Sequence, residues 1–199
     1  AMVVAWGLAG SLKLDSTAFK AALDTDPLGV ESLFRSAGTA ANASVQYVGA
    51  DGVTPSSVSA LVVTRAATRS TTLGAAFATY TAGATPASMT VTAEGSGRSA
   101  TITLANADTP AILAAKLQAA FNEENVAVNA SVEGGALRLT STDYGSLGGF
   151  TVAYTDPGAE APGTQLGLAA GSFDTGLDAA GTLDGEAMTG AGQLLTSLK

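Results

Sequence analysis

The sequence contains no cysteine and no histidine among its 199 residues. The absence of cysteine excludes a disulfide framework, thiol catalysis and metal binding through thiolates. The absence of histidine removes the commonest general base, the commonest metal ligand and the side chain that titrates near neutral pH. The sequence therefore lacks the residues on which many enzymes and metalloproteins depend.

Basic residues are also scarce, with 9 Lys and Arg against 17 Asp and Glu and a net charge of −8. A surface that binds nucleic acid needs clustered Lys and Arg, and here the basic residues are scattered. The closest pair, Arg65 and Arg69, is flanked by alanine and threonine and is interpreted as part of a solvated face. No apolar run approaches the length of a membrane span. We therefore expect neither a nucleic-acid partner nor insertion into a membrane.

Aromatic residues make up 6% of the chain and charged residues 13%, whereas alanine, threonine, serine and glycine dominate. Aromatic-lined ligand pockets are usually richer in Phe, Tyr and Trp. Small and β-branched residues favour short strands and turns. This composition is typical of an extracellular or assembly protein.

The stretch from Ser88 to Thr155 predicts strand, turn, strand, helix, strand, turn and strand in that order. Its strands are indicated by runs in which apolar and polar side chains alternate. These runs are 89–92, 100–104, 126–132, 136–140 and 150–152. Gly95–Gly97 and Glu133–Gly135 provide the turns. We predict a small sheet covered by one helix, in the order ββαββ.

The helix of this unit is predicted from Pro110 to about Asn122. Asp108-Thr109 offers capping oxygens, and proline follows at the first helical position, where its missing N–H costs nothing. Leu113, Leu117, Ala120 and Phe121 form an apolar stripe with Ile112 beside it, and Lys116, Gln118 and Asn122 point away. A helix this short is marginal alone, so the stripe must pack on the sheet.

The flanking segments predict short helices and further strands. An alternating run at 11–14 precedes helices at 16–23 and 27–35, and 36–44 forms a linker. Strands are expected at 45–48, closed by Asp51-Gly52, and at 59–65, and Ala66 to Leu73 leads into the central unit. Loops at 156–158 and 161–163 follow. A hairpin is predicted at 178–189 around Asp184-Gly185.

This organisation predicts an α+β fold, mostly antiparallel β with short helices, in two small lobes. The first residues, 1–44, form a helical segment. Residues 45–73 together with 159–199 form a β-rich lobe, into which the ββαββ lobe of 74–158 is inserted. Such an insertion is tolerated when the ends of the inserted lobe lie close together.

No known catalytic or binding constellation occurs in the sequence. The glycine-rich stretches Gly145–Gly149 and Gly190–Gly192 do not stand between a strand and a capped helix, as a phosphate loop would. There is no Gly-x-Ser-x-Gly elbow and no Ser-x-x-Lys, although a Ser–Lys dyad needs only those two residue types. Aspartates that could ligate calcium are interpreted as turn residues beside glycine. They are Asp143, Asp156, Asp174, Asp178 and Asp184. Tyr144 is expected to pack at a strand end, with ligand stacking as the alternative. We assign no catalytic, cofactor-binding or metal-binding residue.

The order of several stretches resembles a known family. The segments 100–104, 108–109, 112–121, 125–128 and 137–146 resemble the flagellin hook IN motif, which occurs in flagellins and flagellar hook-associated proteins. The segments 12–23 and 26–34 resemble a helical part of the flagellar filament cap family, hook-associated protein 2. The segments 61–69, 180–187 and 189–193 are similar to stretches that flank the IN motif in longer members of that family. The terminal coiled-coil helices of the family are not among these residues, so the resemblance is to its head domains.

The resemblance implies an extracellular protein of the bacterial flagellum, located at the distal tip. There a cap oligomer helps secreted flagellin subunits to fold and insert, and in some bacteria the head domains contact host surfaces. The partners implied are other copies of the cap protein, flagellin and a possible host ligand, with no cofactor. A flagellin variable domain or another extracellular adhesin module is the alternative. A third hypothesis, a glycan hydrolase, needs two converging carboxylates. Its candidates Glu94, Glu123, Glu124 and Glu133 fall at predicted strand ends or turns.

Overall fold

The computed structural model describes residues 4–6, 12–32, 38–50, 58–173 and 175–197, which form two compact units, residues 1–58 and 59–199. In the first unit β1 (Val4–Trp6) pairs antiparallel with β2 (Leu12–Leu14). They are followed by α1 (Ser16–Thr25) and α2 (Pro27–Ser32). The carboxylate of Asp15 caps α1, accepting the N–H groups of Thr17 and Ala18 at 3.0 Å. Both predicted helices are confirmed, and the last residues predicted for the second lie outside the described part.

The strand predicted at 45–48 is wrong, because the structure gives these residues no regular secondary structure. A turn precedes them: the side chain of Asn42 accepts the Ser44 N–H at 2.9 Å, and its carbonyl accepts the Val45 N–H at 3.0 Å. A short alternating run becomes a strand only where a neighbour completes its hydrogen bonds. None of the described strands pairs with this run. The turn Asp51-Gly52 lies outside the described residues.

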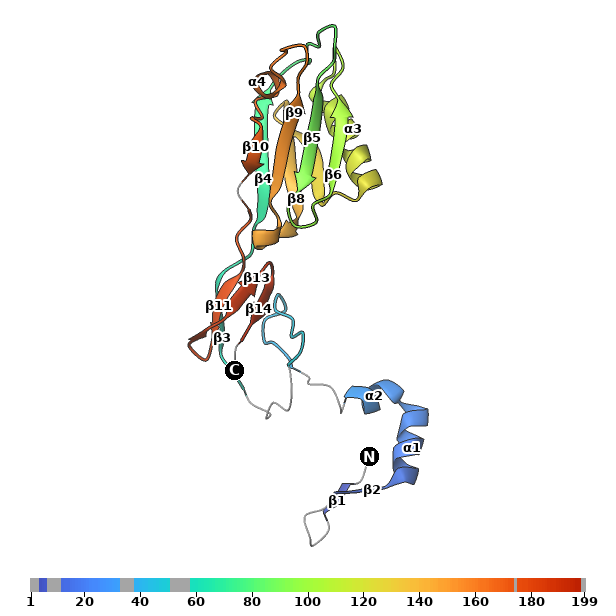
Figure 1. The fold of residues 1–199 in the computed structure, drawn as a ribbon. Helices are drawn as coiled ribbons and strands as arrows, with labels where there is room; N and C mark the ends of the chain where they lie inside the picture. The colour runs from blue at the N-terminus through green and yellow to red at the C-terminus, as the bar shows by residue number, and fades with distance from the viewer. Residues whose placement is uncertain (1–3, 7–11, 33–37, 51–57, 174, 198–199) are drawn as a thin grey trace. The chain divides into compact units, whose positions relative to one another are not determined.

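The second unit is built around two facing antiparallel sheets (Figure 1). The first has the order β10 (Gly171–Phe173), β9 (Phe150–Thr155), β5 (Ser88–Ala93) and β6 (Ser99–Thr103). The second has the order β4 (Arg69–Ala76), β8 (Ala136–Tyr144) and β7 (Val128–Glu133). The helix α3 (Pro110–Glu124) packs against β6, β7 and β8, and so connects the two sheets along one side. We call these two sheets and α3 the sandwich.

The predicted strands and helix are present, but the single sheet is wrong. The hairpin of β7 and β8 does not join β5 and β6; it pairs with β4, a strand that was expected to be a lead-in to the central unit. Each hairpin has one apolar face, and the two faces bury one another together with the helix. Further short elements were not predicted: η1 (Gly145–Leu147), α4 (Pro162–Leu166), expected to be loop, and β10.

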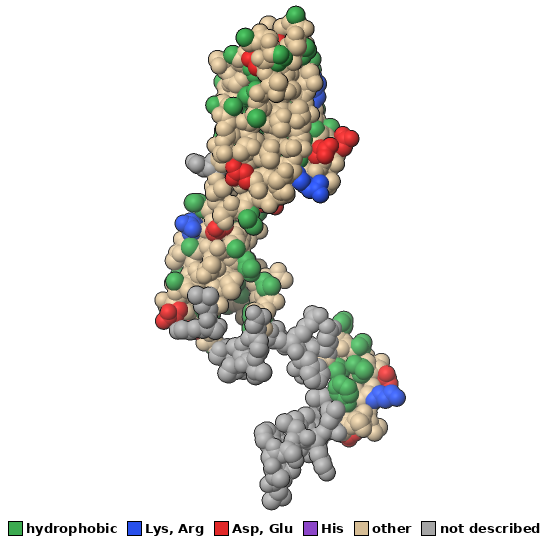
Figure 2. Space-filling model, viewed as in Figure 1, with side chains coloured by type: hydrophobic (Ala, Val, Ile, Leu, Met, Phe, Trp, Pro, Cys, Tyr) green, Lys and Arg blue, Asp and Glu red, His purple; other side chains and the backbone are tan. Residues whose placement is uncertain are grey.

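The outward faces of the two sheets differ in charge. On β10, β9, β5 and β6 every outward side chain except Ala153 carries a hydroxyl. Figure 2 shows this surface almost free of charged side chains, with red and blue at its margins. The outward face of the other sheet includes Arg138, which pairs with Glu133, and Arg69. The sandwich therefore has one neutral face and one charged face.

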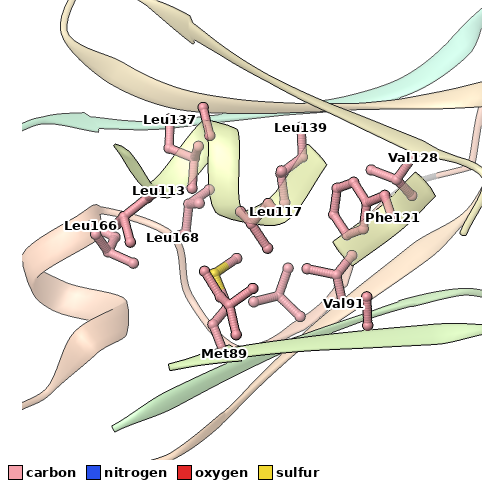
Figure 3. Packing of buried hydrophobic residues seen from close by; sticks show 14 of the residues in the cluster. Met89, Val91, Leu113, Leu117, Phe121, Val128, Leu137, Leu139, Leu166 and Leu168 are labelled. Carbon is pink, nitrogen blue, oxygen red and sulfur yellow. The ribbon is translucent and has the colours of Figure 1, made fainter. Parts of the chain in front are cut away.

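The core of the sandwich lies between the sheets and is completed by α3 (Figure 3). Leu113, Leu117 and Phe121 of the helix are at most 1% exposed. They meet Met89 and Val91 of β5 from one side and residues of β7 and β8 from the other (Figure 3). Burying each such side chain contributes roughly 1.5–3 kcal/mol. The predicted apolar stripe is thus confirmed, although Ile112 at its border is 44% exposed.

Of the two residues predicted to cap α3, Thr109 does so and Asp108 does not. The hydroxyl of Thr109 accepts the Ile112 N–H at 3.3 Å as the cap, and Asn125 ends the helix in the left-handed conformation at φ 52°. Asp108 has another role: it is 5% exposed, accepts the Ala105 N–H at 2.8 Å and pairs with the Lys116 ammonium at 2.6 Å. Lys116 therefore does not point freely into solvent as the sequence suggested. Its ion pair connects the helix to the loop that precedes it.

The remaining strands of the second unit form two smaller sheets. β12 (Glu186–Ala187), β11 (Ala180–Leu183) and β3 (Leu61–Arg65) pair in that order, and β13 (Thr189–Ala191) pairs with β14 (Leu194–Thr196). The predicted turn at Asp184-Gly185 is confirmed, with φ of 52° and 84°. We call these strands the small β region. With both regions mostly antiparallel β and the helices short, the predicted α+β fold class is confirmed. None of the helices among the described residues is long and apolar enough to cross a membrane.

Candidate functional site

The chain passes twice between the small β region and the sandwich, at 66–68 and at 175–179 (Figure 1). Thr68 connects the two passages. Its N–H donates to the carbonyl of Leu177 at 2.8 Å, and its hydroxyl accepts the Leu177 N–H at 2.8 Å. Its carbonyl accepts the N–H of Gly145, the first residue of η1, at 2.9 Å. A single residue thus joins both passages to the end of the sandwich. We call this region the junction.

Asp178 is the charged group at the centre of the junction. Its Oδ1 accepts the N–H of Ser146 from the sandwich at 2.9 Å and the N–H of Gly192 from the small β region at 2.7 Å. Its carbonyl accepts Nε of Arg65 at 2.9 Å. The N–H bonds from Ser146 and Gly192 stabilise the ionised carboxylate and lower the pKa of Asp178, and the Arg65 charge adds to this effect. One carboxylate therefore holds two parts of the fold together.

Both glycine-rich stretches that the sequence analysis rejected as phosphate loops meet at this carboxylate. Gly145 has φ 75° and Gly192 has φ 56°, in the left-handed region that favours glycine. A Cβ on Gly145 would overlap Asp178 Oδ1 and the backbone of Gly192. A Cβ on Gly176 would overlap the carbonyl of Thr68 in the same way. These glycines are required because the backbones approach one another closely.

A shallow groove lies beside the junction. It is lined by Arg69, Ser96, Asp143, Tyr144, Leu147 and Gln193, among others. The Arg69 guanidinium stands over the ring of Tyr144, 4.3 Å from its centroid, which is a cation–π contact. Leu147 is 64% exposed at the groove. Tyr144, expected to pack at a strand end, thus packs under Arg69.

A second polar cluster holds the loop after β4 against the segment before α4. The buried Tyr80 hydroxyl donates to Glu160 at 2.6 Å, and the Gly83 N–H donates to the same carboxylate. The carboxylate of Asp156 accepts the N–H groups of Glu160 and Ala161 at 2.8 and 2.9 Å. Burial, and then the hydrogen bond to Glu160, raise the pKa of Tyr80. The phenol therefore stays protonated and acts as a donor that closes this loop.

The other acidic candidates do not converge. Glu94, Glu123, Glu124 and Glu133 are all exposed, as predicted, although Glu123 and Glu124 lie in the last turn of α3 and not at a strand end or in a turn between strands. Asp184 lies in the predicted turn and its carboxylate accepts the N–H of the distant Ala60 at 2.7 Å, so like Asp156 and Asp178 it binds backbone N–H groups. Asp143 lies near the end of β8, and Asp174 lies outside the described residues. Among the residues that the structure places, no group of three or more acidic side chains could hold a metal ion.

Arg65 and Arg69 are the site residues whose roles the sequence did not reveal. They were interpreted as a solvated face, and both are exposed. Each nevertheless has a defined contact, Arg65 with the carbonyl of Asp178 and Arg69 with the ring of Tyr144. Their partners lie far away in the sequence, so no local pattern could indicate these contacts.

We expect the Asp178 carboxyl to titrate below the ordinary aspartate value of about 3.9. Because its pKa is lower in the folded protein, the stabilisation it provides is present above about pH 3.9 and is lost as the pH falls through the folded value. The titration can be followed by the 13C shift of this carboxyl group. Protection of the Ser146 and Gly192 amides should fall as this carboxyl is protonated. In the Asp178→Asn control it should not depend on pH in this range, because the amide side chain does not titrate. A midpoint at or above the ordinary value would contradict the role given to these N–H donors.

Comparison with known proteins gives neighbours by structure only. No protein-family model matches the sequence, and no curated protein matches it. A structure of the D2-D3 domains of the flagellar cap protein FliD from Serratia marcescens is 20% identical, covers 74% of this chain and 92% of that one, and has a TM-score of 0.48. The D1-D2-D3 structure from Escherichia coli is 19% identical, with a TM-score of 0.46. It covers 70% of this chain, which spans 44% of that one. FliD (HAP2) from Pseudomonas aeruginosa PAO1 is 19% identical, covers 71% and 70%, and has a TM-score of 0.43. The three neighbours carry the same protein name, FliD.

Proposed function

We propose that this chain forms head domains of a bacterial flagellar filament cap, outside the cell at the distal tip, where it promotes the assembly of flagellin. The observation that carries the proposal is the order of the sequence stretches that resemble this family, which covers segments of both units. Within this order, the stretch from Ser88 to Thr155 folds into the predicted strands and helix. The proposed work is steric, and it needs no catalytic residue or cofactor.

The physical property that supports a steric role is the bonding of the junction. Its contacts are backbone hydrogen bonds through Thr68 and the two N–H bonds to Asp178. Two of these bonds, from the Thr68 N–H to the Leu177 carbonyl and from the Gly145 N–H to the Thr68 carbonyl, join backbone to backbone. A change of side-chain rotamer cannot break them, so they restrict the orientation of the parts they join. A component that guides the insertion of another protein has to present a fixed surface. The junction provides that restriction within the second unit.

The proposal also covers organisation and partners. We infer a helical segment at 1–44 and, after it, a β-rich lobe that carries a second lobe as an insertion. The sequence set the insertion at 74–158 within 45–73 and 159–199, and the strand pairing adds β4 (Arg69–Ala76) and β10 (Gly171–Phe173) to the inserted side. In the full-length protein we propose self-association into a cap oligomer and contact with flagellin subunits. A surface ligand of a host cell is a further proposed partner, as in adhesion.

Localisation on the bacterial surface tests this function most directly. Antibodies raised against this chain should label one point per flagellum, at the end farthest from the cell, when viewed by immunogold electron microscopy. Deletion of the gene should leave flagellin unpolymerised in the medium, and the intact gene should restore filaments. Labelling along the whole filament would indicate a flagellin variable domain instead, and labelling of the cell body an adhesin. Either pattern would overturn the cap proposal.

A further inference from the structure

The neutral outer face of the sandwich has a regular chemical pattern. Its outward residues are Ser172 on β10, Thr151, Ala153 and Thr155 on β9, Ser88, Thr90 and Thr92 on β5, and Ser99, Thr101 and Thr103 on β6. The strand registers place these residues in rows across the sheet: Thr90 lies opposite Thr101 on one side and Ala153 on the other. All are exposed or half-buried. We call this surface the hydroxyl face.

The chemistry of the hydroxyl face limits what it can bind. Its outward positions, all of them in the described part of the chain, carry no charge and no aromatic ring. A charged partner would find no ion pair there, and a sugar or base would find no ring on which to stack. Each hydroxyl can both donate and accept a hydrogen bond, as the Thr90 and Thr101 pair shows at 2.8 Å. An array of such groups is complementary to another array of the same kind.

The net charge of the chain also favours a second copy of the hydroxyl face as the partner. With a net charge of −8, two copies repel one another across most contacts. The hydroxyl face brings two sheets together without placing like charges opposite each other. The outer face of the other sheet, with Arg138, Glu133 and Arg69, has no such property. We propose that the hydroxyl face is a contact surface for the hydroxyl face of a second copy of this chain.

The size of the face defines the kind of contact. Four strands about 4.8 Å apart, over five residues rising about 3.3 Å each, cover roughly 300 Å² per copy. Two such faces bury roughly 600–700 Å², well below the ~1,200 Å² of a stable, independent interface. The contact is therefore weak alone and acts where other contacts already hold two copies with these faces opposite one another. In this respect it rests on the proposed function, in which copies of the chain assemble.

Weak contacts of this kind can be detected with spin labels, because the chain has no cysteine of its own. Thr101→Cys places a label on the hydroxyl face, and Ser131→Cys places a matched label on the outward face of β7. Each labelled protein is mixed at high concentration with 15N-enriched chain that carries no spin label. We expect the label at position 101 to broaden the amide NMR signals of Thr90, Thr92 and Thr151 in the 15N-enriched copy, so that their intensity falls. Equal losses from the two labels, or none from either, would overturn the proposal.

A lysine placed on each face separates this contact from the effect of net charge. Thr101→Lys and Ser131→Lys each change the net charge from −8 to −7, which by itself weakens repulsion between copies. On the hydroxyl face, however, the contact buries each lysine against hydroxyl groups with no carboxylate to pair it, which costs free energy. We expect the second virial coefficient from light scattering to rise for Thr101→Lys and to fall for Ser131→Lys. A fall for both would overturn the proposed contact. Since the function is tested separately by localisation, tip labelling together with this result would reject the contact and leave the cap proposal standing.

Discussion

Replacing Leu117 with alanine is expected to destabilise the second unit by about 2–5 kcal/mol, the range for large-to-small changes in a packed core. Leu117 is fully buried at the middle of α3. Its side chain contacts a cluster to which both sheets contribute, so neither sheet can close the cavity alone (Figure 3). Because native stabilities are of order 5–15 kcal/mol, this one change removes a large part of the total.

The matched control for this substitution is Ile112→Ala on the same helix. Ile112 is 44% exposed, so its truncation should cost less than about 1 kcal/mol while removing a similar number of atoms. The free energies of unfolding of both variants can be measured in urea, with amide exchange of the sandwich strands as the probe of unfolding. Fluorescence would not serve, since the single tryptophan, Trp6, lies in the other unit. Equal costs for the two variants would show that α3 does not close the core as described.

The second large effect is expected at Gly145, where alanine should cost more than about 2 kcal/mol. Two causes combine there. The backbone has φ 75°, and the added Cβ would overlap Asp178 Oδ1 and the backbone of Gly192. The hairpin of β13 and β14 must then move away, which breaks the hydrogen bond from the Gly192 N–H to Asp178. Amide exchange should show lost protection at Ser146 and Gly192 before the sandwich core is affected.

Gly134→Ala separates the two causes. Gly134 has φ 58°, but nothing lies within 4 Å of the position of its Cβ. Its substitution therefore measures the conformational cost alone, about 1 kcal/mol. The difference between the two variants is the contribution of close approach at the junction. If Gly145→Ala cost no more than Gly134→Ala, the two regions would not be in tight contact there.

The elements that local chemistry defines were predictable from the sequence. Thr109-Pro110 begins α3 and the spacing of Leu113, Leu117 and Phe121 selects its buried face, because these signals lie within a few residues of one another. Alternation predicted β5 through β9 for the same reason. The hairpin at Asp184-Gly185 needs only two residues with positive φ.

The pairing of these elements was not predictable in the same way. β4 contains Ser70, Thr71 and Thr72 followed by Gly74 and has no apolar alternation; it is a strand because β8 completes its hydrogen bonds. Its register is interrupted by bulges, which further obscure a period of two. The sheet to which a hairpin belongs depends on contacts between distant residues. The prediction of one sheet failed at this step.

The candidate site was hidden from sequence reasoning for a related reason. Gly145 and Gly192 are required by their proximity to Asp178, and no spacing in the chain indicates that proximity. The aspartate was assigned to turn chemistry, and it does accept backbone N–H groups. What the sequence could not show is that these groups come from two different regions of the fold.

The pairing of β3 with β11 has a consequence for the order of folding. Arg65 lies opposite Ala180, and Leu61 opposite Leu183, so β3 cannot form these pairs until the distant residues 180–183 have been synthesised. The hairpin of β5 and β6 joins neighbouring residues and closes a short loop, which is a fast step. We therefore expect the sandwich to nucleate around this hairpin and α3, and the small β region to form last. In refolding experiments the amides of β3 should become protected late, and a chain truncated before residue 180 should keep them unprotected throughout.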